Sequence, residues 1–143
     1  MVEAEPKLIA SDPIKLQMVM QHKDAGNVKF REKDFEAAIS QYEEALAQAE
    51  EIDDPSAELE ELKVKVLQNM AVCSNNTEKW NDTIALCSMV VSKDPSAKKA
   101  FYLRSIAYGK TDDPVKAMTD IVAAIKLDPS DTCLRAHHAI IKQ

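Results

Sequence analysis

The chain has 143 residues, of which 45% are hydrophobic and 29% charged, and its formal net charge is −6. These values are ordinary for one soluble globular domain with a core large enough to fold alone. The acidic balance argues against nucleic acid, whose phosphates need a basic surface, and no apolar run approaches the roughly 18 residues of a membrane span. The first residues lack the basic and apolar regions of a signal peptide, so we expect a cytoplasmic protein, with the nucleus as the alternative.

The composition predicts an all-α fold. The good helix formers Ala, Leu, Glu, Lys, Gln and Met dominate the sequence. Only two glycines occur, Gly26 and Gly109, and aromatic residues make up 5%. Alternating β-branched runs closed by Asn-Gly or Asp-Gly turns are absent, so nothing indicates a β-hairpin.

Prolines mark where the predicted helices begin and end. Three Asp-Pro pairs each place an acidic N-cap before a proline at the first helical position, namely Asp12-Pro13, Asp54-Pro55 and Asp113-Pro114. Two identical tripeptides, Asp94-Pro95-Ser96 and Asp128-Pro129-Ser130, each end one helix and begin the next. Seven helices are therefore expected, at about 13–32, 35–51, 55–76, 80–92, 96–110, 114–127 and 130–142. They follow an N-terminal tail, residues 1–12, that we expect to be flexible.

The two tripeptides are 34 residues apart, and the segments around them repeat with that period. A third copy lies upstream at an offset of 45, with the 11 extra residues around positions 50–61. The sequence thus predicts three antiparallel helix pairs, at about 13–51, 55–95 and 96–130, and a last helix, 131–143, that covers the apolar end of the array. The aligned columns are Gly26, Ala71 and Ser105; Phe35 and Trp80; Tyr42, Cys87 and Ile121; and Ala45, Val90 and Ala124.

The first copy resembles the opening of a tetratricopeptide repeat (TPR). The resemblance is carried by Lys23-Asp-Ala-Gly26-Asn27-Val-Lys-Phe30 and Phe35-Glu-Ala-Ala38-Ile-Ser-Gln-Tyr42-Glu-Glu-Ala45, and in the last copy by Tyr108, Ala117, Ala124 and Pro129. It covers roughly residues 18–130 and implies three TPR helix-turn-helix repeats plus a capping helix in a right-handed superhelical solenoid. The lengthened first pair and the segment 67–73 are similar to the C-terminal domains of FKBP-type immunophilins and large cyclophilins, which are co-chaperone modules.

The resemblance also implies a ligand. Related co-chaperone domains hold the acidic C-terminal tail of heat-shock protein 90 or 70 in a carboxylate clamp of lysines, asparagines and an arginine. Residues four apart share a helix face, lysines are charge-assisted donors to carboxylates, and asparagine amides bond carboxylate or peptide groups. The residues that match the clamp positions are Lys23 and Asn27 in the first repeat, Asn69 in the second and Lys99 in the third.

The fifth clamp position departs from the family's pattern. Leu103 stands where the arginine belongs, and Arg104 follows one residue later, turned by about 100°. Two alternatives remain open for Arg104: its long side chain reaches the ligand, or it lies along the solvated side of its helix. Leu103 is accordingly either a gap in the clamp or an apolar contact for a different ligand.

The remaining candidate residues surround the clamp in the family's ligand groove. Phe30 and Tyr102 either form an apolar pocket for the peptide or belong to the buried core. The family's groove positions here hold five basic residues and the single acid Asp24, although the chain as a whole is acidic, and a basic groove suits an acidic peptide. The basic residues are Lys23, Arg31, Lys65, Lys99 and Lys110.

No pattern in the sequence indicates catalysis, a cofactor or a metal. Cys73 and Cys87 lie in apolar helical segments, and the three cysteines have no CxxC spacing, so these two are expected to be reduced core residues. His137 and His138 are adjacent and therefore point to different helix faces, which makes them a poor metal pair. No local nucleophile motif is present, and the resemblance places the isomerase domain of a parent protein outside this chain.

The sequence therefore predicts a protein–protein interaction domain of a co-chaperone. Its expected partner is the acidic C-terminal tail of heat-shock protein 90 or 70, or a similar acidic peptide. The alternative is a TPR scaffold that binds a different protein partner, with the clamp altered at Leu103.

Overall fold

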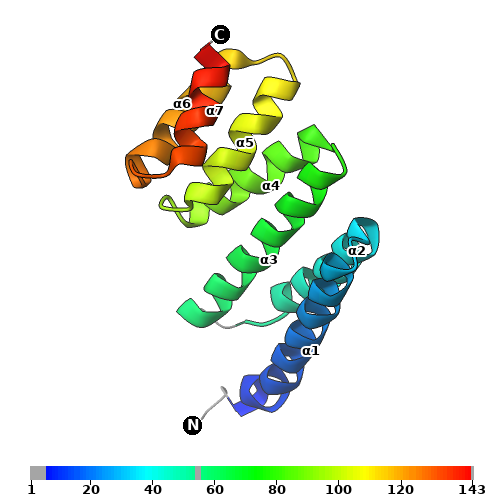
Figure 1. The fold of residues 1–143 in the computed structure, drawn as a ribbon. Coiled ribbons are helices and arrows are strands. Elements are labelled where there is room, and N and C mark those ends of the chain that lie inside the picture. The colour runs from blue at the N-terminus through cyan, green and yellow to red at the C-terminus, as the bar shows by residue number, and fades with distance from the viewer. Residues whose placement is uncertain (1–5, 54–55, 143) are drawn as a thin grey trace. The chain divides into compact units, whose positions relative to one another are not determined.

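The structure is a computed structural model that describes the backbone of residues 6–53 and 56–142, and the side chains of residues 13–53 and 56–142. The described residues form seven α-helices and no strand, which confirms the all-α prediction (Figure 1). They divide into two compact units, the first up to Val66 and the second from Leu67 onward. The helices are α1 (Pro6–Arg31), α2 (Phe35–Glu50), α3 (Ala57–Asn76), α4 (Trp80–Lys93), α5 (Lys98–Lys110), α6 (Pro114–Leu127) and α7 (Thr132–Lys142).

The first helix begins earlier than predicted. It starts at Pro6, and Pro13 lies inside it. A proline is favourable at the first helical position, so Pro6 serves there as well as Pro13 would have. Pro13 removes one backbone hydrogen bond from the helix interior, and a helix of 26 residues keeps its other bonds on both sides. The expected flexible tail is thus corrected for residues 6–12, which are helical, and residues 1–5 lie outside the described part of the chain.

Capping residues set the starts of the later helices. The predicted Asp113-Pro114 cap is confirmed, because the Asp113 carboxylate accepts from the Lys116 N–H at 3.2 Å. The predicted cap at Asp54-Pro55 lies outside the described residues. Helix α3 instead starts at Ala57, after Ser56, whose Oγ accepts from the Leu59 N–H at 3.2 Å. A serine hydroxyl that satisfies an N–H of the first turn is an ordinary N-cap.

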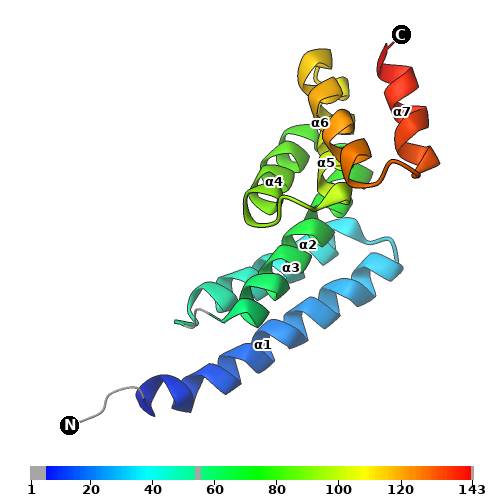
Figure 2. The same cartoon turned by 90° about the vertical axis from the view of Figure 1, so that its left-hand side faces the viewer.

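The first unit is built on the antiparallel pair α1 and α2, which lie side by side in both views (Figures 1 and 2). Gly26 of α1 sits against the ring of Tyr42 of α2, which is only 1% exposed. A Cβ atom added at Gly26 would lie 2.6 Å from Tyr42 Cε1 and 2.7 Å from its Cδ1, closer than real contacts allow. The large ring and the absent side chain therefore require each other, as the aligned columns indicated.

In the second unit the equivalent columns are also buried. Cys87, Val90, Ile121 and Ala124 are all 0% exposed. A hydrogen bond between Ser74 Oγ and Thr83 Oγ1, at 2.8 Å, joins the end of α3 to α4.

The two cysteines that were predicted to be core residues are both buried and unpaired. They are Cys73 and Cys87, and both are 0% exposed. Burial raises their pKa values to about 11 and about 12, so both thiols stay protonated at neutral pH.

The turns inside three helix pairs share one backbone conformation. Lys33, Glu78 and Asp112 have φ of 63°, 59° and 62°, in the left-handed region that glycine prefers. They are 45 and 34 residues apart, the same offsets as the repeat. In each turn the next residue's N–H donates over 2.9 Å to the carbonyl five residues earlier in the chain. The hydrogen bonds of the turn thus impose the conformation on three different residues.

The last helix covers α5 and α6, as predicted for a capping helix. Leu134 of α7 packs with Ile121 and Ala124 of α6 in one buried cluster. At the other end of the contact, Lys98 of α5 donates to both Asp128 and Asp131, each at 2.9 Å. Apolar packing and one exposed ion-pair cluster together hold α7 in place.

His137 also attaches α7 to α5. Its ring meets the Tyr102 ring edge to face with centroids 5.4 Å apart, and its Nε2 lies 3.2 Å from Ser105 Oγ. The Ser105 hydroxyl has one proton, which it donates to the Ala117 carbonyl at 2.8 Å. Nε2 must therefore carry a proton and donate it to Ser105 Oγ. Desolvation in this position lowers the pKa of His137 from its ordinary value of 6.5.

The two glycines should respond oppositely to alanine. Gly26→Ala forces a Cβ into the buried Tyr42 ring and should lower the free energy of unfolding by about 1–3 kcal/mol, the usual range for overpacking. Gly109→Ala is the matched control, since an added Cβ there meets nothing within 4 Å. It should leave stability unchanged or raise it by up to about 1 kcal/mol, because alanine favours helix. Urea denaturation of both variants measures this, and a stable Gly26→Ala variant would contradict the packing.

Stability should depend on the protonation of His137. Because its pKa is lowered in the folded state, the unfolded chain binds a proton that the folded chain does not. The free energy of unfolding should therefore decrease as the pH falls below about 6.5, until the pH is below the folded-state pKa. His137→Gln keeps a donor for Ser105 but does not titrate, so its decrease should be smaller. Urea denaturation at about pH 7.5 and about pH 5.5 compares the two proteins, and equal decreases would exclude His137 as the cause.

Candidate functional site

Each unit holds part of the predicted ligand-binding set, and each part is described by itself. In the first unit, Lys23 and Asn27 lie one turn apart on α1, and both are half-buried. Asn27 Oδ1 accepts a hydrogen bond from the Tyr42 hydroxyl at 2.6 Å. This bond fixes which way the amide points, so that a ligand carboxylate would be met by the donor end of Asn27. The same tyrosine that packs on Gly26 thus orients a candidate binding residue.

Two further candidates belong to the first unit. Phe30 is half-buried and meets the Phe35 ring edge to face, with centroids 5.6 Å apart. It therefore supports the turn between α1 and α2 and keeps part of its surface exposed. Lys65 of α3 is exposed to solvent.

In the second unit, Asn69 of α3 is half-buried and Lys99 in the first turn of α5 is exposed. Lys99 has no acidic group within 4 Å among the described residues. The preceding residue Lys98 differs, because Asp128 and Asp131 neutralise it. Lys99 therefore offers an ammonium group to solvent, as a ligand-binding lysine must.

Leu103 lies inside the second unit. Its exposed fraction is 5%, and it lies on the buried side of α5 with Ala100 and Ala107. It is one turn beyond Lys99, where α5 has entered the core. Leu103 is therefore a packing residue, which does not fit the alternative that made it an apolar contact for a ligand.

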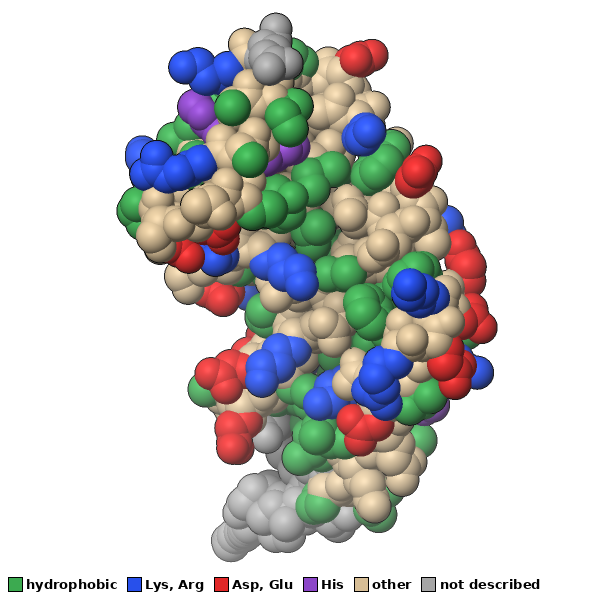
Figure 3. Space-filling model, viewed as in Figure 1, with side chains coloured by type: hydrophobic (Ala, Val, Ile, Leu, Met, Phe, Trp, Pro, Cys, Tyr) green, Lys and Arg blue, Asp and Glu red, His purple; other side chains and the backbone are tan. Residues whose placement is uncertain are grey.

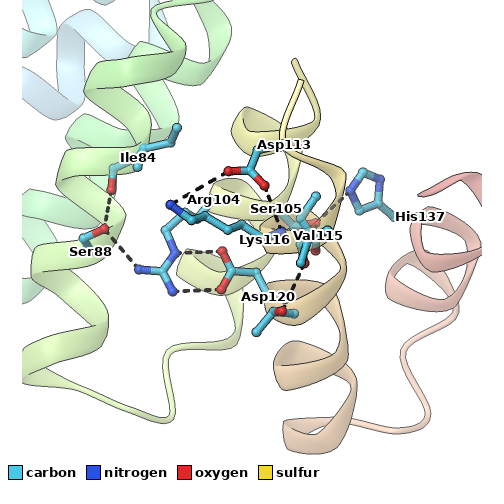
Figure 4. A network of polar contacts seen from close by, with 11 residues as sticks. Ile84, Ser88, Arg104, Ser105, Asp113, Val115, Lys116, Asp120 and His137 are labelled. Carbon is cyan, nitrogen blue, oxygen red and sulfur yellow. Dashed lines mark hydrogen bonds and ion pairs between the residues drawn. The ribbon is translucent and has the colours of Figure 1, made fainter. Parts of the chain in front are cut away.

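Arg104 takes neither of the two positions expected for it. Its Nε and Nη2 donate to the two carboxylate oxygens of Asp120 at 2.7 and 2.8 Å, and its Nη1 donates to Ser88 Oγ at 3.0 Å (Figure 4). The Arg104 side chain is 18% exposed and that of Asp120 5%. The Arg104 guanidinium also lies 5.7 Å from the ring centroid of Phe101 and 5.9 Å from that of Tyr108. Arg104 is thus neither on a solvated face nor directed at a ligand.

This network joins three helices of the second unit. Ser88 lies on α4, Arg104 on α5 and Asp120 on α6, and Ser88 Oγ donates in turn to the Ile84 carbonyl at 2.7 Å (Figure 4). Sequence reasoning missed Ser88 and Asp120. A signal existed for Asp120, since it is the one acid in the apolar segment from Ala117 to Ile125 and a charge in such a segment needs a partner.

Tyr102 serves the packing of α7. It is half-buried, its ring contacts His137, and its hydroxyl oxygen is 3.6 Å from Cys133 Sγ, which can donate to it. The hydrogen bond with Cys133 and burial raise the pKa of Tyr102 to about 12. Of the two alternatives for Tyr102, its contacts favour the packing role.

On the face shown in Figure 3, lysine and arginine side chains stand singly among apolar and uncharged ones, whereas most acidic side chains lie toward the margins. No three or more His, Cys, Asp or Glu side chains of the described residues are placed to hold a metal ion. None of the described helices is both long and apolar enough to cross a membrane.

Comparison with known proteins gives two curated relatives, and no protein-family model matches the chain. Both relatives are named peptidyl-prolyl cis-trans isomerase D. The one from Kluyveromyces lactis is 26% identical over 129 residues, 83% of this chain, and the one from Eremothecium gossypii is 28% identical over 137 residues, 89% of this chain. The chain spans 35% and 37% of their respective lengths, about a third of each protein.

Solved structures with the same fold are TPR domains. The C-terminal TPR-containing domain of an FK506-binding protein from Plasmodium falciparum has a TM-score of 0.79 at 23% identity, over 89% of this chain and 87% of that one. The first TPR domain of Spaghetti (RPAP3), bound to the HSP90 peptide SRMEEVD, has 0.74 at 20%, over 89% and 92%. The second TPR domain of human RPAP3, in complex with the HSP70 peptide SGPTIEEVD, has 0.76 at 22%, over 90% and 98%. The fold is that of a TPR domain, which confirms the resemblance.

Arginine at position 103 should destabilise the domain rather than complete a clamp. Leu103→Arg places a guanidinium in a position that is 5% exposed, where no acidic partner was designed for it. We expect a loss of about 2–5 kcal/mol in the free energy of unfolding. Leu103→Met conserves the volume and should cost less than about 1.5 kcal/mol. Chemical denaturation of the two variants tests this, and an Arg variant as stable as the Met variant would mean that position 103 is accessible.

Proposed function

We propose that this chain is the interaction domain of a co-chaperone and binds the acidic C-terminal peptide of heat-shock protein 90 or 70. The observation that carries the proposal concerns the three lysines assigned to the ligand, Lys23, Lys65 and Lys99. None of the three has an acidic group within 4 Å among the residues that the structure describes. A lysine without an internal partner keeps its ammonium for a ligand.

Other lysines in the same helices are neutralised. Lys15 of α1 pairs with Glu51 at 3.5 Å, and Lys63 of α3 pairs with Glu50 at 3.5 Å and Glu60 at 3.3 Å. In α5, Lys98 pairs with two aspartates. Each helix thus carries one paired lysine and one lysine assigned to the ligand. On a chain of net charge −6, such unpaired cations give the ligand-binding residues a charge opposite to the rest of the protein.

The two asparagines complete the proposed ligand set. Asn27 and Lys23 share a face of α1, so that one carboxylate can accept from the ammonium and from the amide together. The bond from Tyr42 to Asn27 Oδ1 holds the amide in one orientation before the ligand arrives. Such preorganisation reduces the entropy lost on binding. Asn69 has the same chemistry on α3 and is assigned to the peptide's terminal carboxylate by the resemblance alone.

Structural likeness supports the choice of ligand. Two of the solved TPR domains with this fold are bound to peptides that end in the same four residues, EEVD. Both peptides carry two adjacent glutamates and end in aspartate, so their charge is complementary to the unpaired lysines. The full-length relatives named as isomerases are about three times longer than the aligned region, and we propose for this chain only the interaction, not the isomerase activity.

The second candidate is a TPR scaffold for a different protein partner. The observation in its favour is that α5 has no arginine available at the clamp position, since Leu103 is buried and Arg104 is bound to Asp120. A chaperone tail would then lose one pair of hydrogen bonds. The two candidates differ in one measurable property, which is the affinity for an EEVD peptide.

Removal of either ligand lysine should weaken binding to the peptide SRMEEVD. Lys23→Ala and Lys99→Ala should each lose about 1.5–3 kcal/mol of binding free energy, the scale of a hydrogen bond to a charged group, or about ten- to a hundredfold in affinity. Raising the salt concentration should weaken the wild type further, because exposed charges are screened beyond about 8–10 Å. Isothermal titration calorimetry measures both effects.

Lys126→Ala is the matched control, because Lys126 of α6 is also exposed and also has no acidic group within 4 Å among the described residues. It should bind like the wild type. If all three variants bind equally, the ligand does not use Lys23 or Lys99. If the wild type does not bind the peptide, the scaffold candidate replaces the chaperone-tail proposal.

A further inference from the structure

Helix α5 carries four cationic side chains, and three of them are already occupied. Lys98 is neutralised by Asp128 and Asp131. Arg104 uses all three guanidinium nitrogens on Asp120 and Ser88. The Lys110 ammonium lies 5.9 Å from the centroid of the Trp80 ring, in cation–π range. Within the described residues only Lys99 among the four has no such partner.

We infer that the second unit recognises its acidic ligand with a single ammonium group, so that this domain requires one acidic side chain at that place and not two. The inference rests on the proposed function and narrows it. It names Lys99 as the residue that determines acidic specificity on α5. It also predicts that peptides with one acidic residue followed or preceded by a neutral one are ligands as good as those with two.

The geometry of Arg104 keeps it out of recognition. Its bond to Asp120 is bidentate, with N–O distances of 2.7 and 2.8 Å, and the Asp120 side chain is only 5% exposed. To reach a ligand, the guanidinium would have to leave a buried carboxylate without a partner, which is far less favourable than leaving an exposed one. Two aromatic rings, of Phe101 and Tyr108, further restrict its movement.

Leu103 makes the arrangement consistent. An arginine at 103 would be one turn from Lys99 and would provide a planar fork that fits a second carboxylate. Leucine provides none, and at 5% exposure it contributes to the core instead. A lysine ammonium is a compact charge without a preferred plane, so it accepts aspartate and glutamate side chains alike. One acidic position is therefore read by charge rather than by shape.

The experiment uses the intact chain and three peptides, so it does not depend on a variant that folds poorly. The peptides are SRMEEVD, SRMQEVD and SRMEQVD, in which glutamine replaces one glutamate at a time without changing its shape. We expect one replacement to reduce affinity by about tenfold or more and the other by less than about threefold, since only one glutamate meets a cation of α5. Titration calorimetry at low salt gives the three dissociation constants.

Two protein variants identify the cation. On Lys99→Gln, the sensitive peptide and its parent should bind equally, because the charge that distinguished them is gone. On Lys126→Gln, the matched exposed lysine of α6, the difference should persist. Losses of about tenfold at both glutamates, or at neither, would overturn the single-cation inference while leaving chaperone-tail binding intact. No binding of SRMEEVD at all would instead overturn the proposed function, and the inference with it.

Discussion

The bidentate ion pair between Arg104 and Asp120 determines which side of α5 faces the ligand. The pair is nearly buried and links α5 to α6, while the bond to Ser88 links α5 to α4. With α5 held in this rotation, Lys99 lies outside and Leu103 lies inside the second unit. A buried ion pair is weak evidence for stability, because desolvation offsets much of its attraction. Its effect here is geometric, since it gives one orientation of a helix whose surface carries recognition.

Much of the fold was predictable because packing constraints leave periodic marks in a sequence. Gly26, Ala71 and Ser105 form a column of small residues because a neighbouring helix comes close there, and at Gly26 the Tyr42 ring leaves no room even for a methyl group. The buried residues Cys87 and Ile121 form a second column for the same reason. Repeated aspartate–proline pairs mark helix starts because both residues are favourable there. The number of helices and their approximate bounds followed from these marks alone.

The candidate site was predictable only in part, because a side chain's partner can be distant in sequence. The periodicity placed Lys99 on α5 and left Arg104 about 100° away, but its partner Asp120 is 16 residues further on and has no sequence mark of pairing. The same holds for Tyr102, whose contacts come from α7. The early start of α1 was missed because Pro13 was interpreted as a first-turn proline, and a proline signals either a start or an interruption.

The left-handed residues in the three turns have a consequence for how this domain can change over time. Lys33, Glu78 and Asp112 hold a conformation that costs an ordinary residue roughly 1 kcal/mol and glycine almost nothing. None of the three is assigned to the ligand. A lineage of such domains, or an engineer, can therefore gain thermal resistance by glycine substitutions at these turns while the recognition surface stays as it is. Robustness and binding preference are thus encoded at separate positions, and each can drift without the other.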